Sequence, residues 1–248
     1  MTLPPPPMSE APQDNMAARA LATKLRELST CEIADALLKL GVPSGGLVPD
    51  LKMYSPLFEA GDTRIAGPAF TVEMVPVAHP DKSKPAQHFV DGAPPGSVIF
   101  ISTPQGTRSG CWGGLMSTAA QAKGVVGAVL DGGFRDINEH RALGFPVFAR
   151  HHSTLGPGTF TRVRALGATL TIDPYPPHAE PRFPSTTVRP GDIVVADLDG
   201  VIVVPVELAE DVIAKVGPAH EADEKVRADL VAGKGVAESM LKWRGKAP

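Results

Sequence analysis

The chain has 248 residues, of which 43% are hydrophobic and 21% are charged. This balance is typical of a folded globular protein and excludes a fibrous repeat and global disorder. The formal net charge is −3, so no basic surplus suggests a nucleic-acid partner. No apolar run reaches the roughly 18 residues that a membrane-spanning helix needs. We therefore expect a cytoplasmic protein whose partners are neither nucleic acid nor membrane.

Two cysteines are present, Cys31 and Cys111, which excludes a disulfide framework. Neither lies in a CxxC pair, so a zinc site with thiolate ligands has no support. The proline-rich residues 1–15 are expected to form a disordered tail. Because composition does not change sharply further on, residues 16–248 are expected to form a single domain.

The first half of that domain alternates helical and strand patterns. Ser29 or Thr30 is expected to cap the second helix, and Gly41 to end it. Residues 45–61 are expected to be irregular, and a long polar connection to run over 76–95 with a short helix near 87–90. The other expected elements are helices at Ala17–Leu28 and Cys31–Leu40 and a strand at Ile65–Val75.

The segment from Ser97 to Arg150 predicts a β-α-β-α-β unit. Its strands are expected at Ser97–Ser102, Val125–Leu130 and Pro146–Arg150, with helices at Leu115–Lys123 and Ile137–Leu143. Short apolar strands that alternate with helices indicate a parallel sheet with right-handed crossovers. The fold class is therefore α/β.

The segment after Arg150 does not continue this alternation of strands and helices. Residues 174–184 hold many prolines and are expected to be irregular. Strands are expected at Thr186–Val188 and on both sides of a tight turn at Asp197–Gly200. The C-terminal part is expected to form two helices, Val206–Val216 and His220–Trp243.

Two loops are the candidate functional elements, because ligands of open α/β sheets bind beyond the carboxyl ends of the strands. The first, Thr103–Gly114, opens into a helix whose free amides would attract a carboxylate or phosphate. A plain glycine turn that packs a strand near a helix explains this loop equally well. It is not a phosphate loop of the Walker type, since no Gly-Lys-Ser/Thr follows.

The second loop, Asp131–Asp136, places Arg135 beside Asp136. An arginine clamps a carboxylate with two parallel hydrogen bonds, and an aspartate holds a hard divalent cation through oxygen. The alternative is structural: Asp136 could cap the next helix, with Glu139 completing a capping box. That alternative leaves Arg135 unexplained. His140 is expected on an exposed helix face, and Cys111 lacks a histidine partner that would make it a nucleophile.

Residues 112–150 resemble the RraA-like family, which includes class II 4-hydroxy-4-methyl-2-oxoglutarate aldolases and oxaloacetate decarboxylases. The family pattern is an acidic residue or glycine, twenty residues, Arg-Asp, two residues, and Glu or Asp. Here it is Gly114, twenty residues, Arg135-Asp136, two residues and Glu139. Supporting matches are EIADAL at 32–37, IAGPAF at 65–70 and DIVVADLDGVIVV at 192–204.

The resemblance implies an α/β/β/α sandwich and a homotrimer or hexamer with active sites at subunit contacts. It assigns Arg135 to the substrate and Asp136 to Mg²⁺ or Mn²⁺. It makes the backbone of Gly113, Gly114, Leu115 and Met116 a cradle for the substrate. A neighbouring subunit's acid would fall near Asp197 or Asp199.

Gly114 stands where some aldolases of this family carry an acidic residue. Decarboxylation of oxaloacetate needs an electron sink but no base to start it. Retro-aldol cleavage needs a base for the hydroxyl proton, and Glu139, His151 or a metal-bound hydroxide could supply one. We therefore expect a divalent-metal-dependent lyase of short 2-oxo dicarboxylic acids, with Arg135, Asp136 and Glu139 catalytic. The alternatives are a protein-binding regulator of an RNA-degrading endonuclease and a catalytically silent oligomeric scaffold.

Overall fold

The computed structural model describes residues 16–174 and 183–245. The expected tail at 1–15 lies outside the described residues, as does most of the proline-rich segment at 174–184. The helices are α1 (Met16–Leu25), α2 (Thr30–Lys39), α3 (Phe89–Gly92), α4 (Gly114–Ala122), α5 (Ile137–Leu143), α6 (Ala209–Val231) and α7 (Val236–Arg244), with a 3-10 turn η1 (Val206–Leu208).

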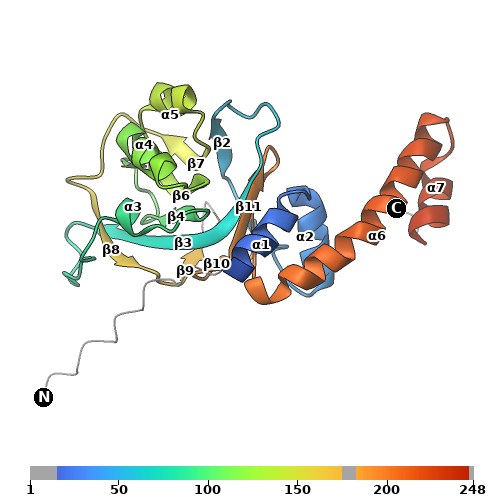
Figure 1. Cartoon of the computed structure of the whole chain (residues 1–248), viewed down its shortest axis with the longest axis horizontal. Coiled ribbons are helices and arrows are strands. Elements are labelled where there is room, and N and C mark those ends of the chain that lie inside the picture. The colour runs from blue at the N-terminus through green and yellow to red at the C-terminus, as the bar shows by residue number, and fades with distance from the viewer. Residues whose placement is uncertain (1–15, 175–182, 246–248) are drawn as a thin grey trace, which may run out of the picture.

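A ten-stranded mixed sheet forms the centre of the molecule (Figure 1). Its hydrogen-bonded order is β1-β12-β11-β3-β4-β6-β7-β2, with β5 beside β6 and β8 beside β3, while β9 and β10 pair separately. The strands are β1 (Leu47–Val48), β2 (Lys52–Ser55), β3 (Ile65–Pro76), β4 (Val98–Ser102), β5 (Gly110–Trp112), β6 (Gly127–Phe134), β7 (Val147–His152), β8 (Thr161–Leu166), β9 (Leu170–Ile172), β10 (Thr186–Val188), β11 (Ile193–Asp197) and β12 (Gly200–Val204).

The long strand β3 divides this sheet into two layers. Its first residues pair antiparallel with β11, and residues from Ala69 onward pair parallel with β4. The strands β4, β6 and β7 are parallel neighbours. The predicted β-α-β-α-β unit is therefore confirmed.

Three apolar clusters fill the spaces between the layers. Because successive strand residues face opposite sides, Phe100 of β4 lies in the cluster between the two sheet halves, while Ile99 and Ile101 face α3, α4 and α5. In the other half, Val194 faces the interior cluster and Val195 packs against α1, α2 and α6. The layers thus follow the order helix, sheet, sheet, helix, which confirms the expected sandwich.

The helix bounds expected from the sequence need two corrections. The first helix ends at Leu25 rather than Leu28. Ser29 caps α2 through a capping box with Glu32, which decides between the two expected caps. The C-terminal helices meet at Gly233, whose φ is +81°, and not near Gly217-Pro218. The proline stays inside the 23-residue α6, so the break falls where a left-handed residue ends the helix.

Several strands were missed. Residues 45–61, expected to be irregular, contain β1 and β2, and β5 lies inside the glycine-rich loop. The expected loop at Asp131–Asp136 begins too early, because β6 continues to Phe134. A Cβ on Gly132 would lie 2.5 Å from the Thr103 Oγ1, and one on Gly133 2.5 Å from the His151 Nε2. These glycines therefore allow close packing and do not turn the chain.

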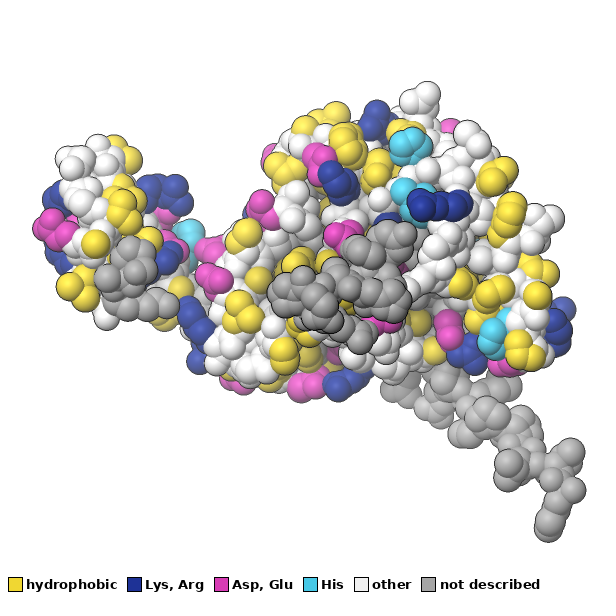
Figure 2. All heavy atoms as spheres, turned by 180° about the vertical axis from the view of Figure 1, so that it is seen from behind, with side chains coloured by type: hydrophobic (Ala, Val, Ile, Leu, Met, Phe, Trp, Pro, Cys, Tyr) yellow, Lys and Arg dark blue, Asp and Glu magenta, His cyan; other side chains and the backbone are white. Residues whose placement is uncertain are grey.

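Helices α6 and α7 extend away from the sheet layers (Figure 1). Figure 2 shows the opposite side of the molecule, where Lys and Arg side chains are interspersed with Asp and Glu on the helical extension and on the body. Among the described residues, no helix is both long and apolar enough to cross a membrane.

Candidate functional site

The two loops predicted to hold the ligand meet at one point. The Gly114 amide at the start of α4 donates a 3.1 Å hydrogen bond to the Asp136 Oδ2 just before α5. This bond joins the two loops at the carboxyl ends of β5 and β6. A hollow of about 580 Å³ opens there, lined by His88, Phe89, Cys111, Trp112, Gly113, Leu115, Met116, Arg135, Asp136, Glu139 and Pro157.

Asp136 has an unusual backbone and an accessible carboxylate. Its φ of 67° and ψ of 42° are left-handed, and its side chain makes no capping hydrogen bond to α5. The structural alternative of a side-chain cap and capping box is therefore wrong. Left-handed geometry costs a non-glycine residue about 1–2 kcal/mol, although aspartate tolerates it better than most. Its carboxylate instead faces the Arg135 Nε at 3.4 Å, with about a third of the side chain exposed.

A buried hydrogen-bond chain holds the backbone of Arg135. The Trp112 indole donates to the Ser117 Oγ at 2.8 Å, and that hydroxyl lies 2.8 Å from the His140 Nδ1. The His140 Nε2 lies 2.6 Å from the Arg135 carbonyl oxygen. Because a carbonyl can only accept, the Nε2 carries the hydrogen, and the Nδ1 of a neutral ring accepts from Ser117.

His140 was expected on an exposed face, and this is wrong: the residue is fully buried. Its ring is turned inward because the position directly behind Arg135 is enclosed by β5 and α4. Burial lowers the pKa of His140, although the Arg135 carbonyl and nearby carboxylates act in the opposite direction. The neutral ring therefore positions the loop that carries Arg135 and Asp136.

This lowered pKa predicts a pH dependence of stability. At a pH below the ordinary histidine pKa of about 6.5, His140 is protonated in the unfolded chain but stays neutral in the folded chain until the pH is lower. The free energy of unfolding is therefore expected to fall as the pH drops below that value. Urea unfolding between neutral and mildly acidic pH measures this slope. His140→Gln should flatten it, whereas His152→Gln, at an exposed position, should leave it unchanged; equal slopes in all three proteins would contradict the assignment.

The Glu139 side chain fills the space into which a side chain at position 114 would extend. An ideal Cβ on Gly114 would lie 1.8 Å from the Glu139 Oε2 and 2.8 Å from the Glu139 Cβ. The Glu139 carboxylate makes no hydrogen bond or ion pair with any residue that the structure describes. A free carboxylate thus occupies the space that a side chain at position 114 would take.

The predicted amide cradle is present only in part. The Gly114 amide is used by Asp136, and the Met116 amide donates to the Gly113 carbonyl at 2.9 Å. Within the described ranges, the amides of Gly113 and Leu115 remain for a ligand at the beginning of α4. The Leu115 side chain is largely exposed, so its contribution to the pocket is mainly backbone.

The sequence reasoning missed His88 and Pro157, which also line the hollow. His88 caps α3 by accepting from the Val90 amide at 3.3 Å and stacks on Phe89 with ring centroids 4.3 Å apart. Its place in the polar connection before a short helix was the only available signal. Cys111 also lines the pocket, but burial raises the pKa of its thiol to about 12, which excludes a thiolate nucleophile at neutral pH.

The donor atoms fit one class of metal ion. No group of three or more His, Cys, Asp or Glu in the described part of the chain is arranged to hold a metal, so a zinc cage does not fit. Asp136 and Glu139 offer carboxylate oxygens in one open hollow. Mg²⁺ is commonly held by one or two carboxylates, with water and substrate oxygens completing its shell.

Comparison with known proteins decides the family. The model of the RraA-like family, described as Aldolase/RraA, matches residues 30–203, which include both loops. The chain belongs to the RraA-like family. The match ends before α6 and α7 and begins at α2, so the helical extension lies outside the matched region.

Two curated relatives are similar over most of this chain. A protein of Halalkalibacterium halodurans named "Putative 4-hydroxy-4-methyl-2-oxoglutarate aldolase" is 30% identical over 83% of this chain and 85% of its own length. Protein DlpA of Legionella pneumophila is 26% identical over 90% of this chain, which spans only 34% of that protein.

Two solved structures share the fold. A protein from Pseudomonas syringae pv. tomato matches with a TM-score of 0.72 and 27% identity, covering 89% of this chain and 96% of that one. RraAS2 of Streptomyces coelicolor, described as an unusual member of the RNase ES inhibitor RraA family, matches with a TM-score of 0.70 and 23% identity, covering 88% and 98%.

Proposed function

We propose that this RraA-like protein is a divalent-metal-dependent carbon–carbon lyase that releases pyruvate from short 2-oxo dicarboxylic acids. The observation that carries the proposal is the convergence of Arg135, Asp136 and Glu139 on one hollow beside the N-terminus of α4. The similarity to a protein named as an aldolase supports the same reaction class. The substrates proposed are oxaloacetate and 4-hydroxy-4-methyl-2-oxoglutarate.

Asp136 would hold Mg²⁺ or Mn²⁺ through a carboxylate oxygen, with water and substrate oxygens completing the shell. When bound, such an ion polarises the 2-oxo group of the substrate and so makes it an electron sink. The side chain of Arg135 is about half exposed, and its guanidinium would neutralise the oxygen that gains negative charge. The amides of Gly113 and Leu115, helped by the dipole of α4, would receive a substrate carboxylate.

The bond that breaks is the one between C3 and C4 of the substrate. In decarboxylation, CO₂ leaves, its bonding electrons form the pyruvate enolate, and C3 then takes a proton. In aldol cleavage, the C4 hydroxyl must also lose its proton, which requires a base. Glu139 is the carboxylate in the hollow without a partner among the described residues, and we assign the proton transfers to it.

We also propose that the active unit is a homotrimer or hexamer in which a neighbouring subunit completes the site. Asp197 is not available for this role, because its carboxylate accepts from the backbone and hydroxyl of Thr30 at 2.9 and 2.6 Å. Asp199 is exposed in the same turn. Of the two acids expected near the contact, Asp199 is therefore the candidate.

The test is pyruvate release from oxaloacetate by the full chain, measured before and after treatment with EDTA. We expect activity to disappear with EDTA and to return with Mg²⁺ or Mn²⁺, because the described residues form no three-ligand cage that would retain the ion. Rates that equal the protein-free rate under all conditions would overturn the proposal. Metal-independent binding to an RNA-degrading endonuclease, together with no lyase activity, would favour the regulator instead.

A further inference from the structure

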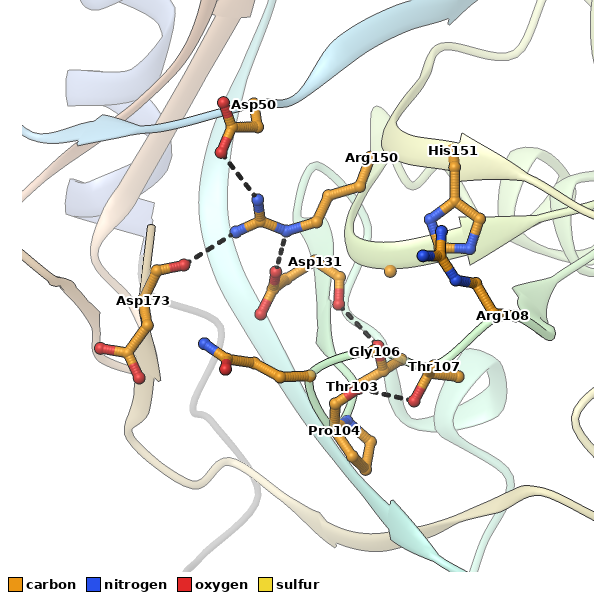
Figure 3. Close-up of a pocket in the computed structure, with 12 residues that line it drawn as sticks. Asp50, Thr103, Pro104, Gly106, Thr107, Arg108, Asp131, Arg150, His151 and Asp173 are labelled. Atoms are coloured by element: carbon orange, nitrogen blue, oxygen red, sulfur yellow. Dashed lines mark hydrogen bonds and ion pairs between the residues drawn. The ribbon is translucent and has the colours of Figure 1, made fainter. Parts of the chain in front are cut away.

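A second hollow lies at the same edge of the sheet, on the other side of the glycine-rich loop (Figure 3). It has a volume of about 220 Å³ and opens between the two sheet halves. Its wall combines the loop that follows β4 with side chains of β6 and β7. The lining residues are Asp50, Thr103, Pro104, Gln105, Gly106, Thr107, Arg108, Asp131, Gly132, Arg150, His151 and Asp173.

One end of this hollow is a closed ionic network. The Arg150 Nε donates to the Asp131 Oδ1 at 2.5 Å, and its Nη1 donates to the Asp50 Oδ2 at 3.2 Å. Its Nη2 donates to the Asp173 carbonyl at 3.1 Å. The three bonds tie β7 to segments on both sides (Figure 3), so these groups are explained by the fold itself.

The other end holds a cation that the fold does not explain. Arg108 is exposed, and its guanidinium makes no hydrogen bond or ion pair within residues 16–174 and 183–245. It lines the hollow together with the ring of His151 (Figure 3). The His151 Nε2 is buried against Gly133, so the Nδ1 is the ring nitrogen left for a ligand. A guanidinium and an imidazole ring therefore face the same small space.

We propose that this hollow is a second binding site, separate from the lyase pocket, for a small monocarboxylate anion. Arg108 would clamp the carboxylate with parallel N–H bonds, and the His151 ring would donate one more. The short apolar body of the ligand would lie against the Pro104 ring and the turn at Gly106, whose φ is +77°. A site of this volume admits a ligand of only a few carbon atoms.

The acidic end makes the site selective. Asp50 and Asp131 lie at the opposite end of the hollow from Arg108, and each pairs with Arg150. A dicarboxylate would bring its second charge toward them, and like charges in a partly enclosed space repel. The site therefore favours monocarboxylates, whereas the lyase pocket is proposed for dicarboxylates.

The test uses propionate as the probe. Calorimetry measures its affinity, and NMR follows the histidine rings. The His151 signal is assigned by its loss in His151→Gln. Burial lowers the pKa of His151, and the positive charges of Arg108, His152 and Arg150 lower it further. An anion on Arg108 offsets that repulsion, so propionate should raise the pKa of His151. Arg108→Gln should weaken propionate binding at least about tenfold, since a charge-assisted bidentate contact is lost.

Two further variants and a second ligand give the controls. Arg227→Gln removes an exposed arginine of α6 and should leave propionate binding unchanged. Succinate should bind more weakly than propionate. The proposal is overturned if propionate does not bind, if Arg108→Gln binds it as tightly as the wild type, or if only Arg135→Gln abolishes binding, which would place the anion in the lyase pocket.

Discussion

Asp136→Asn is expected to lower the rate of pyruvate release by at least about a hundredfold, because a polarising cation contributes several kcal/mol to the transition state. The amide is the same size as the carboxylate, and its oxygen can still accept from the Gly114 amide at 3.1 Å in the wild type. Asparagine also tolerates the left-handed backbone found at this position. The loss should therefore occur with nearly unchanged stability.

The measurement is the steady-state rate with saturating Mg²⁺, paired with urea unfolding of the same samples. Asp62→Asn, at an exposed position, is the matched control and should behave as the wild type. Activity of Asp136→Asn within a few-fold of the wild type would remove Asp136 from the site. A large loss of stability in the variant would show instead that the carboxylate acts through the loop structure.

Gly114→Ala is expected to destabilise the protein by about 1–3 kcal/mol, the usual cost of overfilling a packed site. The backbone of Gly114 does not have a positive φ, and alanine is the better helix former by about 1 kcal/mol. In the absence of a clash, the substitution would therefore stabilise α4. The expected sign comes from the Glu139 Cβ, which would lie 2.8 Å from the new methyl group and cannot move without α5, whereas the Oε2 is the end of a flexible side chain.

A double-mutant cycle isolates this contact. Glu139→Gly removes the three atoms of Glu139 that would lie nearest to the new methyl group, the Cβ included, so Gly114→Ala should cost much less in that background. Gly217→Ala is the control, because that helical glycine has nothing within 4 Å of an added Cβ and should be neutral or stabilising. Additive free energies of unfolding in the cycle would contradict the shared volume.

The same geometry suggests a double variant that moves the carboxylate from position 139 to position 114. Gly114→Asp combined with Glu139→Ala moves the acid to the position that it has in the aldolases which this chain resembles. We expect Gly114→Asp alone to lose activity through the clash and the double variant to recover part of it. If the double variant is no more active than the single one, a carboxylate at position 114 does not replace that of Glu139.

The parallel unit could be predicted because its signals are local. Runs such as Val98–Ser102 and Val147–His152 are short, apolar and separated by helical patterns, which is how strands buried on both faces read. Edge and bent strands carry weaker signals. The two-residue β1 and the half-buried β8 depend on partners far away in the chain, so no local pattern revealed them.

Histidine environments depended entirely on tertiary contacts. His140 lies in a short helix with charged neighbours, which predicts exposure, yet it is buried behind Arg135. Burial is decided by which face of α5 meets α4 and β5, and a seven-residue helix is too short for its periodicity to fix that face. The position of His88 in the hollow could not be predicted for a similar reason, because His88 lies in a connection that has no regular pattern.

The amino-acid sequence by itself determined the layered α/β class and the neighbourhood of Arg135, Asp136 and Gly113, because strand order and handed crossovers bring those loops to one edge. Only the tertiary structure decided how the site is built. The left-handed backbone of Asp136, the overlap of Glu139 with position 114 and the unpaired Arg108 all arise from contacts between segments that are distant in the chain. Those contacts depend on packing to within a fraction of an ångström, which residue spacing does not encode.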